Sequence, residues 1–257
     1  MHPQVEKLLE TNRGLPLQKS EGWYQLRRGC LTASAVASAI GINPYEKPED
    51  LILVKCGFGE FTGNAATEHG EKYEDEARQL YESKYGETVH ELGLLPHPTI
   101  KFLSGSPDGV TESGRLIEIK CPLRRAIGDG GVPGHYMPQL QMLMEILDLE
   151  VCDFIQYKPE AITWPDPYEF TVVTVDRERE WFAENFPIMR NFWGRVLWHR
   201  EHGCDMLRKP KKERKPRKPK APDDTIVCEV GCDAPAVVAT KKERKPVVGD
   251  DNIVCEV

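Results

Sequence analysis

Two spacings of hydrophobic residues alternate along the chain between Gly22 and about Phe192. Apolar residues three or four positions apart line one face of a helix, whereas short runs of alternating or continuous apolar residues are typical of strands. The helical spacing predicts a helix that begins near Thr32 or Ser34 and ends at Gly41, and further helices over Glu68–Tyr85, Tyr136–Leu149 and Trp181–Trp198. The second pattern predicts strands, the first three as a meander, over Val89–Leu95, Phe102–Ser106, Arg115–Cys121, Cys152–Tyr157 and Phe170–Val175. This mixture indicates an α/β or α+β domain.

The composition changes abruptly after Leu207. The segment Arg208–Lys220 holds nine basic residues, one acidic residue and three prolines, so it has nothing with which to bury a core. The motifs KKERKP and DDxIVCEV each occur twice in the last 50 residues, which is too few copies for a repeat fold. We therefore predict one domain over residues 1–207 and a basic, proline-rich, repeat-containing and disordered tail over residues 208–257.

Charge and cysteine content limit the function classes. Residues 1–207 carry 21 basic and 32 acidic side chains, a net charge of −11, so any contact with nucleic acid in this part must be a local basic lining. The eight cysteines form no CxxC pair, which favours reduced thiols over a zinc or iron–sulfur site. No apolar run is long enough for a membrane span or a secretory signal, so we expect an intracellular protein that is not secreted.

The chemically informative residues lie in SPDGV (Ser106–Val110) and LIEIKCP (Leu116–Pro122). Residues two apart in a strand face the same side, so Glu118 and Lys120 project together, and a hairpin-like return would bring Asp108 beside them. Two carboxylates offer the hard oxygen ligands that suit Mg²⁺ or Mn²⁺, and phosphodiester hydrolysis needs such a metal and a nearby positive group. An ordinary turn and an exposed strand face would explain any one of the three residues alone, but explain all three together less well.

These residues resemble a known signature. A PD turn followed by (D/E)xK on the next strand is similar to the PD-(D/E)xK nuclease superfamily. Three further segments resemble, in order, motifs of phage lambda exonuclease and YqaJ-like viral recombinases: WYQLRRGCLTAS (Trp23–Ser34), GEKYEDEA (Gly70–Ala77) and YMPQLQ (Tyr136–Gln141). The resemblance covers about Gly22 to Pro159 and implies a restriction-endonuclease-like core, in which helices flank a central mixed sheet.

The resemblance also implies roles for individual residues. Glu74 and the backbone carbonyl of Ile119 would join Asp108 and Glu118 as metal ligands, and Gln141 would act beside Lys120 in catalysis. Arg27, Ser34 and, with less support, Gln139 would bind DNA or a 5′-phosphate. Local reasoning leaves alternatives open: a solvated helix carboxylate for Glu74, a surface arginine with an N-cap serine, a polar helix face for the glutamines, and a shift of the arginine assignment to Arg28.

The activity implied by the family is an Mg²⁺-dependent exonuclease, with Mn²⁺ as a substitute, that degrades linear double-stranded DNA from 5′ to 3′ and leaves 3′ single strands for recombination or repair. The implied partners are double-stranded DNA ends, a single-strand annealing recombinase and further copies of the chain in a trimer, without a membrane. Two rival hypotheses remain: a structure-selective or nicking endonuclease with the same site, and an inactive DNA-binding protein on the same fold. The basic tail predicts non-specific DNA affinity or nuclear targeting about as well as it predicts a solubilising role.

Overall fold

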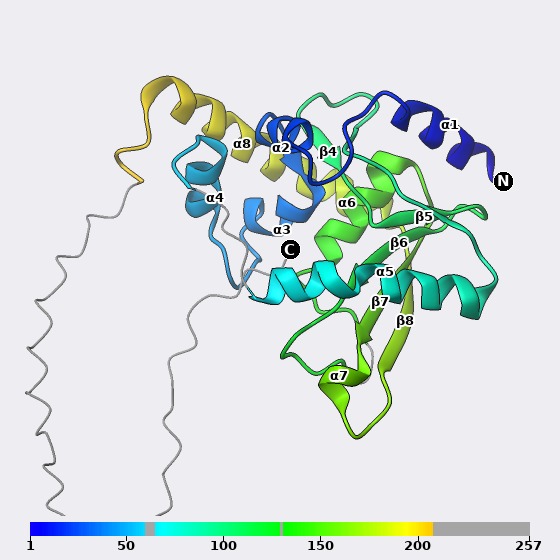
Figure 1. The fold of residues 1–257 in the computed structure, drawn as a ribbon. Coiled ribbons are helices and arrows are strands. Elements are labelled where there is room, and N and C mark those ends of the chain that lie inside the picture. The colour runs from blue at the N-terminus through cyan, green and yellow to red at the C-terminus, as the bar shows by residue number, and fades with distance from the viewer. Residues whose placement is uncertain (60–64, 129–130, 208–257) are drawn as a thin grey trace, which may run out of the picture. The chain divides into compact units, whose positions relative to one another are not determined.

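The computed structural model describes residues 1–59, 65–128 and 131–207 (Figure 1), and the predicted tail lies outside these residues. The helices are α1 (Pro3–Asn12), α2 (Glu21–Arg28), α3 (Val36–Ala39), α4 (Pro48–Lys55), α5 (Ala65–Tyr85), α6 (Met137–Leu147), α7 (Glu160–Thr163) and α8 (Arg179–His202), with a 3₁₀ turn at Ala33–Ala35. The strands are β1 (Leu31–Thr32), β2 (Val89–His90), β3 (Leu95–Pro96), β4 (Leu103–Gly105), β5 (Gly109–Thr111), β6 (Leu116–Lys120), β7 (Val151–Lys158) and β8 (Glu169–Asp176). None of the described helices is long and apolar enough to cross a lipid bilayer.

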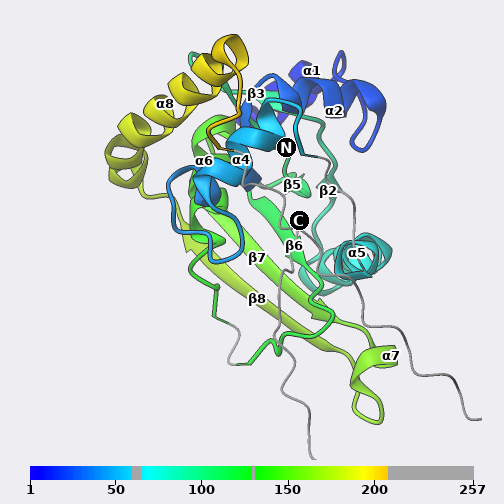
Figure 2. The same ribbon diagram turned by 90° about the vertical axis from the view of Figure 1, so that its left-hand side faces the viewer.

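A five-stranded mixed sheet forms the centre of the fold. Its strand order is β2-β5-β6-β7-β8, and β6 and β7 are parallel whereas the other neighbours are antiparallel. Helix α5 lies along one face and α6 along the other, which the view in Figure 2 shows with α5 end-on beside the sheet. The predicted fold class, a central mixed sheet flanked by helices, is therefore confirmed.

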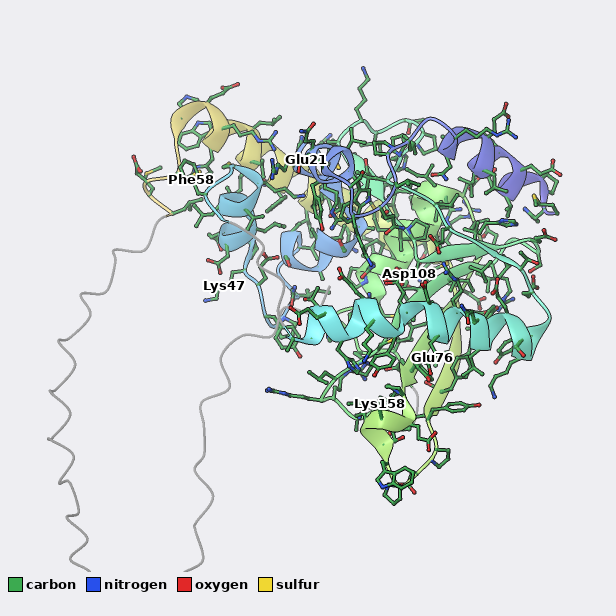
Figure 3. The ribbon with its side chains drawn as sticks, in the orientation of Figure 1. Glu21, Lys47, Phe58, Glu76, Asp108 and Lys158 are labelled. Atoms are coloured by element: carbon green, nitrogen blue, oxygen red, sulfur yellow. The ribbon has the colours of Figure 1, made fainter. Side chains whose placement is uncertain are left out.

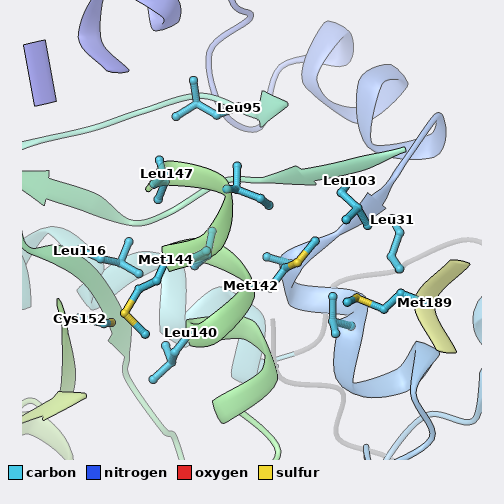
Figure 4. Close-up of a cluster of buried hydrophobic side chains, with 14 of the residues drawn as sticks. Leu31, Leu95, Leu103, Leu116, Leu140, Met142, Met144, Leu147, Cys152 and Met189 are labelled. Atoms are coloured by element: carbon cyan, nitrogen blue, oxygen red, sulfur yellow. The ribbon is translucent and has the colours of Figure 1, made fainter. Parts of the chain in front are cut away.

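Both faces of β6 are buried, and this explains its composition. Ile117 and Ile119 pack with Ala77 and Tyr81 of α5 in one hydrophobic cluster. Leu116 faces the other way, into the main core that surrounds α6 (Figure 4). Eight of the eleven residues of α6 are buried, since this helix has the sheet on one side and the 3₁₀ turn, α3 and α8 on others. A strand between two helices in this way carries few polar side chains unless they have a special role.

The predicted meander is wrong in two respects. The strand expected over Val89–Leu95 is divided into β2, in the central sheet, and β3, in a second sheet. β4 does not join the central sheet but pairs with β1 and β3 in a separate three-stranded sheet, parallel to β1 and antiparallel to β3. The chain changes sheet at the Pro107–Asp108 turn, after which β5 forms an unpredicted strand that pairs with β6. A side chain at Gly109 would collide with Val89, so glycine is required where the turn enters β5.

The predicted helices are present with changed bounds, and four others were not predicted. The helix expected near Thr32 is only a 3₁₀ turn followed by α3, because Thr32 itself pairs with Ser104 as part of β1. Helices α1, α2, α4 and α7 were not expected, and none of them is longer than ten residues. Nevertheless α1 inserts Val5 and Leu8 into the main core, so the packed part of the chain begins well before Gly22.

A buried ionic network ties the start of β7 to its neighbours. Asp153 accepts hydrogen bonds from Arg115 Nε and Nη2 (both 2.6 Å), from Tyr81 Oη (2.6 Å) and from Thr174 Oγ1 (2.8 Å). Burial alone would raise the pKa of Asp153, but these hydrogen bonds outweigh it and hold the pKa below its usual value. The carboxylate therefore stabilises the fold in its charged form.

We predict that Asp153→Ala lowers the free energy of unfolding by about 3–5 kcal/mol, because Arg115 and Tyr81 would lose their buried partner. Asp176→Ala, at an exposed aspartate on the neighbouring strand β8, is the control and should change stability by less than about 0.5 kcal/mol. Urea unfolding at pH 7 measures both. A depressed pKa stabilises the fold above the unfolded-state value of about 4, so the difference from wild type should shrink as the pH falls below that value. Equal stability of the two variants at pH 7 would contradict the assignment.

Candidate active site

Two charged side chains are buried at the end of β6. Glu118 and Lys120 alternate with the isoleucines and face α6, and their side chains are only 1% and 10% exposed. Lys120 Nζ donates to Glu118 Oε1 at 2.8 Å. The interpretation of this strand face as an ordinary exposed surface is therefore excluded. Ionic groups inside a protein are costly unless they are paired, yet Glu118 Oε2 is buried and has no hydrogen-bond partner within the part of the chain that the structure describes.

Asp108 reaches this pair from the turn before β5. β5 pairs with β6 only as far as Gly109 opposite Ile117, so the next inward-facing amide of β6, that of Ile119, has no strand partner on this side. It donates instead to Asp108 Oδ2 at 2.6 Å. Because the N–H and C=O of a strand residue point to the same side, the Ile119 carbonyl also faces the Asp108 side. Figure 3 shows Asp108 beside the middle of α5.

Helix α5 contributes a third carboxylate. Burial raises the pKa of Glu74 to about 7, and the nearby Asp108 adds to this effect. Burial likewise raises the pKa of Asp108 to about 7, with repulsion from Glu118 as the next cause. The pKa of Glu118 is raised by its burial despite the opposing effect of Lys120. At least one neighbouring carboxylate therefore helps to raise the pKa of each of the three, whereas Lys120 lowers the pKa of all of them.

Lys120 remains an ammonium in this setting. Burial would lower its pKa, but Glu118 and Asp108 outweigh burial and raise the pKa above its ordinary value. One positive charge is nevertheless insufficient for three carboxylates. The raised carboxyl pKa values reflect burial first and repulsion between the carboxylates second, and a divalent cation would offset both effects.

The donor set fits such a cation. Asp108, Glu118, Glu74 and the Ile119 carbonyl are hard oxygen donors of the kind that Mg²⁺ and Mn²⁺ prefer. Within residues 1–59, 65–128 and 131–207, no three His, Cys, Asp or Glu side chains are arranged as a ready-made metal site. The fit rests instead on the unpaired Oε2 of Glu118 and on the uncompensated charge.

The two glutamines of α6 differ from the prediction. Gln139 Nε2 donates to Glu118 Oε1 at 2.5 Å, so Gln139 is the glutamine at the carboxylates. Gln141, the residue favoured from the sequence, is buried elsewhere: its Nε2 donates to the carbonyl of Asp176 (2.9 Å), and its Oε1 accepts from the N–H of Glu178 (2.7 Å). The catalytic role expected for Gln141 is therefore not supported. Residues two apart on a helix face different directions, and only one of them can face β6.

Arg27 and Ser34 are brought together. Arg27 Nη2 donates to Ser34 Oγ at 3.1 Å, and its guanidinium lies 4.3 Å from the Trp23 ring centre. Burial lowers the pKa of Arg27, and among the described residues no carboxylate lies within ion-pair distance of it. Arg28 is exposed, so the geometry favours Arg27 over the shifted assignment. A partly desolvated arginine with a hydroxyl is a suitable cradle for a phosphate.

Three supporting residues were missed as contributors to the site. Tyr136 places its ring centre 5.4 Å from Lys120 Nζ. Trp23 Nε1 donates to Ser106 Oγ at 3.1 Å, which joins the Arg27 cradle to the strand end before Asp108. Gln18 Nε2 donates to the Pro107 carbonyl at 3.0 Å. Trp23 and Tyr136 belong to recognisable motifs, but nothing in the sequence around Gln18 indicates a contact 89 residues away.

Comparison with protein families gives a clear assignment. The model for the YqaJ-like viral recombinase domain matches residues 22–150. The chain belongs to this family. The match includes the PD turn, the EIK strand, Glu74 and the Arg27–Ser34 segment, so the site described above lies inside the YqaJ-like domain.

Two viral proteins are similar to this chain in sequence. The chain is 35% identical over 168 residues to uncharacterized protein R354 of Acanthamoeba polyphaga mimivirus, covering 58% of this chain and 31% of that protein. It is 28% identical over 170 residues to a protein of African swine fever virus, covering 53% and 48%. The chain thus spans about a third to a half of the length of these relatives.

Its structure resembles the alkaline exonuclease LHK-Exo of Laribacter hongkongensis, with a TM-score of 0.61 and 28% identity over 71% of this chain and 95% of that chain. LHK-Exo in complex with dAMP gives a TM-score of 0.62, with the same identity and coverage. Together the family and this neighbour support a nuclease.

The contacts of the glutamines lead to a prediction. Gln141→Ala should lower the free energy of unfolding by about 1–3 kcal/mol, because it removes a buried side chain together with its hydrogen bonds to the Asp176 carbonyl and from the Glu178 N–H. Gln139→Ala should cost less than about 1 kcal/mol, since Gln139 is half-buried and Glu118 keeps Lys120. Urea unfolding midpoints measure both. The reverse order of the two losses would show that the glutamine contacts are assigned to the wrong residues.

Proposed function

We propose that this chain is a divalent-metal-dependent DNA nuclease that degrades linear double-stranded DNA from its ends in the 5′→3′ direction. The observation that carries the proposal is the buried Glu118–Lys120 pair beside Asp108, with a carboxylate oxygen that has no hydrogen-bond partner among the described residues. No packing requirement explains such an arrangement, whereas phosphodiester hydrolysis uses each of its parts.

Each residue has a defined task in the proposed reaction. Asp108, Glu118, Glu74 and the Ile119 carbonyl would hold Mg²⁺, or Mn²⁺ as a substitute, which supplies Lewis-acid polarisation of a phosphate oxygen when bound. Lys120 stays protonated and stabilises the negative charge that grows on the phosphate during attack by water. Gln139 holds Glu118 Oε1 in place by its hydrogen bond, and Tyr136 lies against the Lys120 ammonium.

The preference for ends is proposed from the Arg27–Ser34 cradle. The hydrogen bond from Trp23 to Ser106 connects this cradle to the catalytic turn, so a terminal 5′-phosphate held there would present a neighbouring bond to the carboxylates. The name of the structural neighbour, an alkaline exonuclease, and its solved complex with dAMP support a reaction at DNA ends. A 3′ single strand would remain, which suits a single-strand annealing recombinase as partner. We also propose residues 1–207 as the nuclease domain and a trimer as its assembly.

Lys120→Ala tests the chemistry. The purified variant should release acid-soluble nucleotides from linear duplex DNA at least 100-fold more slowly than wild type with Mg²⁺, because the removed charge acts mainly in the transition state. Lys7→Ala, which alters an exposed lysine of α1, is the control and should retain full activity. A covalently closed circle should resist the wild type. Cleavage of the circle would favour an endonuclease, and no hydrolysis with either metal would favour a DNA-binding protein.

Arg27→Gln tests end recognition. Wild type should degrade duplex with 5′-phosphates faster than the same duplex with 5′-hydroxyls, and the variant should lose most of that ratio because a charge-assisted hydrogen bond contributes about 1.5–3 kcal/mol. Arg28→Gln is the matched control, since Arg28 is the exposed neighbour, and it should keep the ratio. Rates on the two substrates at equal concentration give the measurement. Loss of the ratio in Arg28→Gln alone would move the cradle to Arg28.

A further inference from the structure

A short segment between α1 and α2 packs against the catalytic turn. The Gln18 side-chain amide donates to the carbonyl of Pro107 at 3.0 Å and to that of Leu92 at 2.7 Å. Ser20 fixes the other end of the segment, because its Oγ donates to the Leu17 carbonyl (2.7 Å) and accepts from the Trp23 N–H (3.3 Å) at the start of α2. Lys19 lies between these two anchors.

Lys19 has an unusual backbone conformation. Its φ is +65°, in the left-handed region that residues other than glycine, asparagine and aspartate adopt only at a cost. Such conformations persist where the surrounding structure enforces them, and they gather at functional sites. Gln18 and Ser20 provide that enforcement. The residue at this position is nevertheless a lysine, not the glycine that the backbone would favour.

The side chain of Lys19 lies at the carboxylates. Lys19 Nζ is 3.8 Å from Glu74 Oε2 and 3.9 Å from Glu71 Oε1. Its side chain is 46% exposed, so these long ion pairs are solvated and contribute little to stability. These ion pairs are therefore too weak to offset the free-energy cost of the left-handed backbone. A functional need for a positive charge explains a lysine at this position better than stability does.

Two lysines thus lie near the carboxylates, one on their buried side and one on their solvent-exposed side. Lys120 is almost fully buried beneath them, whereas Lys19 lies on the solvent-exposed side. A DNA backbone reaches the site from solvent and would meet a line of negative carboxylates. Lys19 is the cation placed to attract it.

We propose that Lys19 is a substrate-binding residue that contacts a DNA phosphate at or next to the bond that is cleaved, and that its left-handed backbone directs it there. This inference rests on the proposed nuclease function and adds a contact from an element outside the predicted motifs. A neutral residue with the same backbone conformation would lack the positive charge and would not make this contact with the phosphate.

Three substitutions separate charge from backbone. Lys19→Gly and Lys19→Asn both suit a left-handed φ, so thermal stability should be unchanged or higher than wild type. Both should nevertheless lower kcat/KM on linear duplex by roughly tenfold to a hundredfold, the size expected for a charged hydrogen bond, mainly through KM. Lys19→Arg should restore most of the activity. The slope of log(kcat/KM) against log[salt] should become shallower by about 0.9 in the Gly and Asn variants, as for one lost phosphate contact. Lys7→Gln is the control for general loss of charge.

Duplex binding in EDTA, followed by fluorescence anisotropy, gives a readout that needs no cleavage. We expect binding about tenfold weaker in Lys19→Gly than in wild type, with recovery in Lys19→Arg. If wild type cleaves no DNA but this pattern of binding holds, the nuclease proposal fails and the Lys19 contact stands. If Lys19→Gly binds and cleaves as wild type does, the Lys19 contact is overturned while the nuclease proposal stands.

Discussion

The hydrogen bond from the Ile119 amide to the Asp108 carboxylate is the contact on which the site depends. It exists because β5 begins only at Gly109, which leaves one amide of a buried central strand without a partner on β5. Asp108 satisfies that amide from a turn that also links the two sheets, so the geometry of the backbone fixes the position of a reactive carboxylate. Buried amides rarely remain unpaired, and here the need for a partner determines where the chemistry is located.

The same region concentrates charge that the rest of the fold would not tolerate. Glu118, Asp108 and Glu74 approach one another in a partly desolvated space, where the buried Lys120 is the counter-charge that lowers the pKa of all three. The folded part is acidic overall, and it is proposed to act on a polyanion. An acidic protein can bind a polyanion if its positive charges lie where the phosphates would bind. Here Lys120 lies beneath the carboxylates, Lys19 lies at their exposed side, and Arg27 lies in a cradle that has no neighbouring carboxylate among the described residues.

How far the sequence predicts this site depends on how local each contact is. Alternation in LIEIK was enough to place Glu118 and Lys120 on one face, and the short return after Pro107 was enough to bring Asp108 to them. Glu74 lies on a helix among other acidic residues, so only its motif distinguished it. The choice between Gln139 and Gln141 required the rotation of α6 about its axis, which an almost wholly apolar helix does not reveal in its sequence. The separate sheet of β4 and the contacts of Gln18 depend on pairings between distant segments.

The hydrogen bond between Trp23 and Ser106 has a mechanical consequence. Ser106 also donates to the Gly93 carbonyl at 3.0 Å, so a single hydroxyl couples α2, the loop before β3 and the strand end that leads to Asp108. This hydroxyl therefore links the proposed phosphate cradle directly to the segment that leads to Asp108. The fold itself would then set the distance between a bound 5′-phosphate and the bond that is cleaved. The length of each removed fragment would depend on this distance rather than on a moving hinge.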